Sequence, residues 1–130
     1  MRCEPVETSV GAEAAFVFPA RRGLRLALTP TRVIATSMAG TVELPWKGVR
    51  DAEVDGAVLG IAGAAVWTRG GWLGRLNQRA TPYAVSFKAA AFGGEAEDIV
   101  RAIARYKRDA RRRRSIGTEQ EQARLLGERA

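Results

Sequence analysis

The residues with the clearest chemical character are the basic side chains of segment 105–114, which reads RYKRDARRRR. Seven of its ten residues are basic and one is acidic. Arginine and lysine side chains bind phosphates and carboxylates through charge-assisted hydrogen bonds. The sequence therefore predicts a polyanion-binding surface formed by six arginines. These are Arg105, Arg108, Arg111, Arg112, Arg113 and Arg114.

The excess positive charge of the chain is concentrated around this segment. The 130 residues carry a net charge of +7, and residues 101–114 hold eight basic residues and one acidic residue. The rest of the chain is close to neutral, whereas a nucleic-acid-binding domain more often spreads basic residues over one face. Three interpretations stay open: a solvated helix end that complements the helix dipole, a contact with an acidic protein or assembly partner, and a contact with nucleic-acid phosphates or an anionic membrane surface.

A second candidate contact is the segment 69–81, which reads RGGWLGRLNQRAT. Connections of this length in a compact domain are usually binding loops or disordered segments. Aromatic, aliphatic and arginine side chains together are typical of an interaction hot spot. The predicted partner-binding residues are Trp72, Leu73, Arg75 and Arg79. The alternative for Trp72 is that it packs back onto the domain.

The residues that usually carry catalysis or bind metals are scarce. The chain has no histidine and one cysteine, Cys3, which removes the common triads and zinc sites. Asp51, Glu53 and Asp55 alternate along one expected strand face. They are either a carboxylate or hard-metal site or the solvated face of an edge strand. We expect the second, and therefore no enzyme, no metal, no cofactor and no small-molecule substrate.

The elements that would position these residues follow two periodicities. Residues 14–88 alternate over short segments and predict six or seven strands. The clearest strands are 24–28 and 32–36, which a Thr-Pro-Thr turn joins into a hairpin. We expect Trp46 and Trp67 in the core. Asp51 and Glu53 lie within the expected strand 49–54, and Asp55 follows it directly.

From residue 95 the period changes to that of an amphipathic helix, which the sequence predicts over 95–114. Its apolar stripe weakens after Ala110, so we expect the helix to project into solvent beyond that residue. Thr118 and Glu121 have the spacing of a capping box and predict a short helix that ends near Gly127.

The order of these elements resembles that of small bacterial pleckstrin-homology-like domains. The resemblance lies in LRLALTPTRVIAT (Leu24–Thr36), TVELPWKGVRDAEV (Thr41–Val54), the strand Tyr83–Phe87 and the final helix. It implies an α+β fold, with an open antiparallel β-barrel, or two bent sheets, capped by one C-terminal amphipathic helix. It also implies a scaffold that binds peptides, proteins or lipid headgroups and rarely catalyses. The basic residues around the first hairpin do not complete a lipid-binding motif, so phosphoinositide binding is not implied.

These expectations combine into one hypothesis. Residues 1–13 form an N-terminal arm, 14–114 the barrel and helix, and 115–130 a tail with a short helix. The domain is a non-enzymatic protein-interaction or assembly module that uses the 69–81 loop and the basic helix end. The alternative is binding of nucleic acid or an anionic membrane through segment 101–114. The acidic N-terminal sequence is unlike a signal peptide, which favours a cytoplasmic location.

Overall fold

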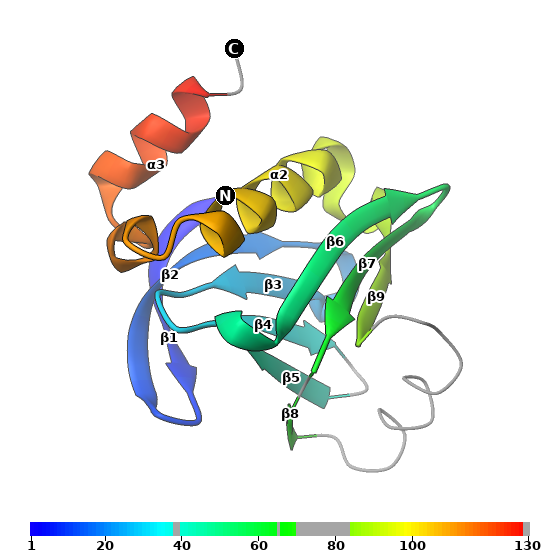
Figure 1. Cartoon of the computed structure of the whole chain (residues 1–130). Helices are drawn as coiled ribbons and strands as arrows, with labels where there is room; N and C mark the ends of the chain where they lie inside the picture. Colours follow the sequence, from blue (N-terminus) through cyan, green and yellow to red (C-terminus); the bar gives the residue numbers. More distant parts are fainter. Residues whose placement is uncertain (38–39, 65, 70–83, 129–130) are drawn as a thin grey trace.

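The computed structural model describes residues 1–37, 40–64, 66–69 and 84–128, which form two antiparallel sheets and one main C-terminal helix (Figure 1). The described strands are β1 (Arg2–Thr8), β2 (Gly11–Pro19), β3 (Arg25–Leu28), β4 (Arg32–Ser37), β5 (Gly40–Pro45), β6 (Val49–Asp55), β7 (Val58–Gly63), β8 (Val66–Arg69) and β9 (Val85–Lys88). The α-helices are α2 (Ala96–Arg108) and α3 (Glu119–Gly127), and the 3₁₀ turns are η1 (Arg21–Gly23), η2 (Trp46–Gly48), η3 (Ala89–Glu95) and η4 (Arg112–Ser115).

The strands form two sheets that do not close into a barrel within the described residues. One sheet has the order β1-β2-β3-β4-β5-β8 and the other has the order β6-β7-β9. The α+β class, the antiparallel pairing and the C-terminal helix are thus as predicted. Nine strands are described where six or seven were expected, and the separate second sheet leaves the predicted barrel open.

The predicted hairpin of β3 and β4 is present, with Leu28 paired to Val33. Its turn is stabilised by Thr29, whose hydroxyl accepts hydrogen bonds from the backbone N–H groups of Thr31 and Arg32. Successive side chains of β3 point to opposite faces of the sheet, and Leu26 and Leu28 lie on the face that forms the main core. Local pattern and turn chemistry therefore agree at this hairpin.

The N-terminal residues, expected as an arm, form β1 and the start of β2. Residues 2–8 pair with residues 11–17 in a continuous antiparallel register. β1 contains Pro5 and the two acids Glu4 and Glu7, and it lacks the alternation that predicts a strand. Such residues are tolerated because β1 is at the edge of its sheet.

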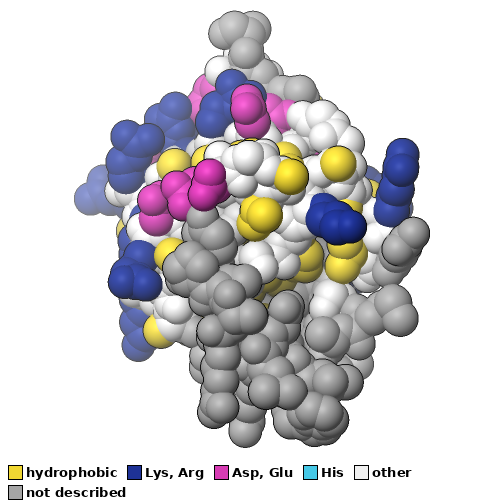
Figure 2. Space-filling view, turned by 90° about the vertical axis from the view of Figure 1, so that its right-hand side faces the viewer, with side chains coloured by type: hydrophobic (Ala, Val, Ile, Leu, Met, Phe, Trp, Pro, Cys, Tyr) yellow, Lys and Arg dark blue, Asp and Glu magenta, His cyan; other side chains and the backbone are white. Residues whose placement is uncertain are grey.

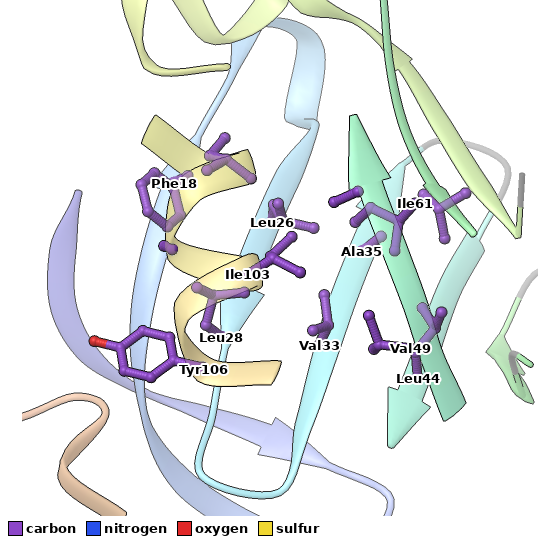
Figure 3. Close-up of a cluster of buried hydrophobic side chains, with 14 of the residues drawn as sticks. Phe18, Leu26, Leu28, Val33, Ala35, Leu44, Val49, Ile61, Ile103 and Tyr106 are labelled. Atoms are coloured by element: carbon purple, nitrogen blue, oxygen red, sulfur yellow. The ribbon is translucent and has the colours of Figure 1, made fainter. Parts of the chain in front are cut away.

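Helix α2 packs against both sheets and completes the main core. It buries Ala96, Ile99, Ala102, Ile103 and Tyr106, which recur every three or four residues. Figure 3 shows Ile103 beside Leu26 and Leu28 from β3, and the same core cluster includes Tyr106, Phe18 and Val49. The predicted placement of Trp46 in the core is confirmed: it is 2% exposed and its indole N–H donates to the Thr29 carbonyl at 2.7 Å.

The predicted helix over 95–114 is wrong at its C-terminal end. Helix α2 ends at Arg108, and Asp109 has an extended backbone. The Asp109 carboxylate accepts a hydrogen bond from the Arg112 N–H at 3.2 Å, which begins η4. The chain therefore turns back at Asp109 and does not project as a helix.

The short helix α3 confirms the expectation drawn from its capping sequence. The Thr118 hydroxyl accepts a hydrogen bond from the Glu121 N–H at 3.2 Å. The Glu121 side chain does not return to the cap as in a capping box; it packs toward α2. In the described part of the chain, no helix is both long enough and apolar enough to cross a membrane.

Candidate functional site

The predicted basic surface is divided by the structure, and Arg112 does not belong to its exposed part. The Arg112 side chain is 3% exposed and forms a short ion pair with Glu121, which is equally buried. It also contacts the Glu128 carboxylate at 2.8 Å and lies over the Tyr106 ring. Burial alone would lower the pKa of the Arg112 guanidinium, but its bonds to Glu121 and Glu128 raise it. Arg112 is therefore a charged anchor for α3.

Tyr106 completes this buried cluster. Its hydroxyl donates to the Glu121 carboxylate at 2.9 Å, and its ring packs near Phe16 and Trp46. Burial and the neighbouring Glu121 carboxylate raise the pKa of Tyr106 far above its ordinary value. The hydroxyl is thus a permanent hydrogen-bond donor that orients Glu121.

Arg113 has a second structural role, at the end of α2. Its guanidinium donates to the carbonyls of Tyr106 at 2.6 Å and Lys107 at 3.0 Å. It also lies 5.4 Å from the centre of the Trp46 ring. Carbonyls in the last turn of a helix lack intrahelical partners, so Arg113 caps α2 while keeping part of its surface exposed.

The remaining cations surround the C-terminal end of α2, and with Arg113 they form what we call the basic patch. Lys107 belongs to it because its ammonium donates to the Trp46 carbonyl at 3.1 Å, which places it beside Lys47 in η2. The basic patch consists of Lys47, Lys107, Arg108, Arg111, Arg113 and Arg114. Within η2 and residues 105–115, the only acid is Asp109, whose carboxylate accepts from the Arg112 N–H at the start of η4.

Figure 2 shows several Lys and Arg side chains along one edge of the face, with others on the opposite side and Asp and Glu side chains between them. Arg111 and Arg114 are exposed, and neither forms an ion pair with a described residue. Positive potential in the basic patch is therefore available to an external anion.

A groove lies next to the basic patch, between α2 and α3. It has a volume of about 320 Å³, an apolar floor that includes Phe18 and Ala102, and charged residues along its rim. Arg105, which was predicted as a polyanion ligand, lies on this rim, 3.4 Å from Glu128. Of the predicted polyanion ligands, Arg105 and Arg108 thus face the groove, Arg111 and Arg114 are open to solvent, and Arg112 is buried.

The predicted partner-binding residues Trp72, Leu73, Arg75 and Arg79 lie outside the described residues. The backbone of β8 places Trp67 opposite Val42 in the sheet, but its side chain is also outside the description. The loop contact therefore stays a prediction.

The acidic strand face and the cysteine give no reactive centre in the described residues. Asp51, Glu53 and Asp55 are exposed along β6, and no group of three or more acidic or cysteine side chains there could hold a metal ion. The Cys3 thiol donates to Gln122 in α3 at 3.3 Å. Burial, and to a lesser degree the Glu119 carboxylate, raise the pKa of Cys3, so this thiol is a poor nucleophile at neutral pH.

Sequence reasoning did not find the α3 wall of the groove or the role of Lys47. The capping signal at Thr118 located α3 but carried no information about what it packs against. Nothing in a local pattern pairs Glu121 with Arg112.

Comparison of the chain with family models, curated proteins and solved structures gave no match.

Proposed function

We propose that this chain is a non-enzymatic protein-interaction or assembly module that binds an acidic surface of a partner protein through the basic patch. The observation that carries the proposal is the group of six cations around the end of α2, with a single acid among them that is engaged in the backbone of η4. The predicted loop residues Trp72, Leu73, Arg75 and Arg79 are proposed as a second contact, and the cytoplasm as the location.

A pleckstrin-homology-like relationship belongs to the same proposal. It is supported by consecutive antiparallel strands followed by a helix that packs against both sheets. A scaffold of this kind holds its ligands on loops and helix ends. The absence of histidine from the sequence supports a binding role over a catalytic one.

A protein surface is a better match to the basic patch than duplex nucleic acid. Two of the predicted arginines, Arg112 and Arg113, are engaged in internal contacts. Exposed acids flank the patch, with Asp51 and Glu53 on β6 directly after η2. A continuous phosphate backbone would meet these acids, whereas a compact acidic surface need not.

The test compares three fluorescent probes at about 50 and 200 mM salt: a glutamate-rich peptide, a duplex DNA and an anionic phosphatidylserine vesicle. The double variant Arg111→Glu/Arg114→Glu should weaken binding of the peptide by about tenfold or more. The control Arg21→Glu/Lys88→Glu makes the same change in net charge on η1 and β9. It should leave peptide binding within about twofold of the wild type.

Two results would overturn the proposal. Equal losses in both double variants would show a response to net charge alone. Binding of DNA or vesicles that exceeds peptide binding at the higher salt, and that depends on Arg111 and Arg114, would assign the basic patch to phosphates.

A further inference from the structure

The groove between α2 and α3 follows most of the length of α2. Its wall on that side extends from Glu95, just before the helix, to Arg108 at its end, a span of roughly 20 Å at helical rise. The opposite wall includes Leu125 and Leu126, and Leu126 keeps 42% of its surface exposed. Phe18 and Ala102 form its floor but are almost fully buried, so the apolar surface that a ligand meets comes mainly from Ala104, Leu125 and Leu126. The groove is therefore long and open, with apolar side chains between charged ones.

The two ends of the groove differ in charge. At the C-terminal end of α2, Arg105 and Arg108 line the rim opposite Glu128. The Glu128 carboxylate already accepts from the buried Arg112, and Arg105 is half exposed beside it. Arg108 has no acidic partner among the described residues. Positive charge is thus in excess at this end.

At the other end the charges are balanced. Asp98 pairs with Arg101 at 2.6 Å, and Glu95 lies 3.1 Å from the Met1 amino group. A ligand that spans the groove would therefore meet positive charge at one end only. This asymmetry sets a direction for an elongated charged ligand.

We propose that this groove receives an amphipathic helix of the partner protein, antiparallel to α2, with an acidic first turn beside Arg105 and Arg108. The inference rests on the proposed function, because it names the part of the partner that binds next to the basic patch. The apolar side chains of the helix, spaced at i, i+3 or i+4 and i+7, would lie on Ala104, Leu125 and Leu126.

The direction follows from the helix dipole. Acidic residues are most favourable in the first turn of a helix, so the partner's N-terminus would lie at the positive end of the groove. That end is the C-terminal end of α2, so the two helices are antiparallel and their dipoles are opposed. Ion pairs as exposed as Arg105–Glu128 contribute little to stability, which leaves Arg105 free to exchange partners.

The experiment uses two labelled peptides of about 14 residues, which match the length of the groove. Both carry leucines at the anchor spacing. The forward peptide has three glutamates in its first turn and three lysines in its last, and the reversed peptide has these charges exchanged. By fluorescence anisotropy at about 150 mM salt, the forward peptide should bind the full-length protein about tenfold more tightly than the reversed peptide.

Two variants locate the binding. Ala104→Trp fills the groove from the α2 wall and should abolish binding of the forward peptide. Arg108→Glu should remove or invert the preference between the peptides, whereas the control Lys88→Glu on β9 should not change it. Thermal melts identify any loss of folding in Ala104→Trp. If Ala104→Trp does not fold, the result for Arg108→Glu, a substitution of an exposed residue, decides whether the peptide binds in the groove.

Equal binding of the two peptides, no binding, or binding that Ala104→Trp leaves intact would overturn the inference. Sodium dodecanoate binding that Ala104→Trp removes, in the absence of peptide binding, would assign the groove to a small anionic amphiphile instead. The Arg111→Glu/Arg114→Glu variant separates this inference from the proposed function. It should lose the glutamate-rich peptide and keep the forward peptide. If it keeps both, the proposed function fails and the groove inference stands.

Discussion

Arg112 and Glu121 form the contact that attaches α3 to the rest of the molecule. Both side chains are 3% exposed, and Tyr106 donates a further hydrogen bond to the Glu121 carboxylate. A buried ion pair is costly to desolvate, and its loss on one side leaves an uncompensated charge. The pair therefore determines how α3 is placed more than it adds to net stability.

This argument gives a prediction for a double-mutant cycle. Glu121→Leu should lower the free energy of unfolding by about 3 kcal/mol or more, because Arg112 stays buried and keeps only Glu128 as a partner. The double variant Arg112→Met/Glu121→Leu should recover most of that loss. Urea denaturation of the wild type, Arg112→Met, Glu121→Leu and the double variant measures the cycle. A double variant as unstable as Glu121→Leu would contradict the argument.

Glu43 is a second buried acid, on β5, and it connects the sheet to the turn between β1 and β2. Its carboxylate lies 2.5 Å from the Arg32 guanidinium and accepts hydrogen bonds from the Ser9 hydroxyl and N–H. Burial pushes the pKa of Glu43 up, but the hydrogen bonds from Arg32 and Ser9 outweigh it and hold the pKa below 4.5. Its charged form is therefore the stabilising one.

The sign of the pH dependence follows from this lowered pKa. The contribution of Glu43 is fully present above the pKa of the unfolded chain and disappears as the pH falls through the lower pKa of the folded protein. We expect Glu43→Gln to be less stable than the wild type at pH 7, with the difference shrinking below about pH 4.5. Urea midpoints at pH 7, 5 and 3 check this. A difference that is constant over the three pH values would refute it.

At the scale of elements, Gly117 connects η4 to α3 and is packed against β2. Its φ is +92°, and a Cβ atom there would lie 2.6 Å from the Ala15 backbone nitrogen. The conformation favours glycine, and the close approach to backbone admits no side chain. Gly117 therefore allows α3 to begin close to the sheet, where it forms the second wall of the groove.

The prediction for this element compares two glycines. Gly117→Ala should lower stability by about 2 kcal/mol or more through strain and overlap with β2. Gly127→Ala, at the end of α3, has no atom within 4 Å of the added Cβ. It should be neutral or stabilising by up to about 1 kcal/mol. Thermal and urea melts of both variants test the comparison, and equal effects would show that the contact of Gly117 with β2 is unimportant.

At the scale of the whole molecule, one core joins both sheets and α2. Its local parts were predictable from the sequence. The alternation and turn chemistry of β3 and β4, the apolar stripe of α2 and the cap at Thr118 each lie within a short segment. Short segments carry their own periodicity, so these predictions needed no knowledge of distant contacts.

The parts that could not be predicted depend on residues distant in the sequence. The end of α2 is fixed by Arg113, which folds back onto carbonyls beside Trp46. The burial of Arg112 depends on Glu121 and Glu128 in and after α3. A run of arginines gives the same local pattern whether its members are exposed or buried. The sequence therefore indicated a basic surface but not which of its arginines are exposed.

The contacts between β1 and α3 have a consequence for the order of folding. Cys3 contacts Gln122 across 119 residues of sequence, and Gly117 packs against Ala14 and Ala15. Pairing over such separations is slow, because a long segment of chain must be ordered first. During synthesis the β1–β2 hairpin leaves the ribosome before α3 does. Until α3 docks, Arg112 has no carboxylate partner from that helix, so the nascent protein is more cationic at this end than the finished fold.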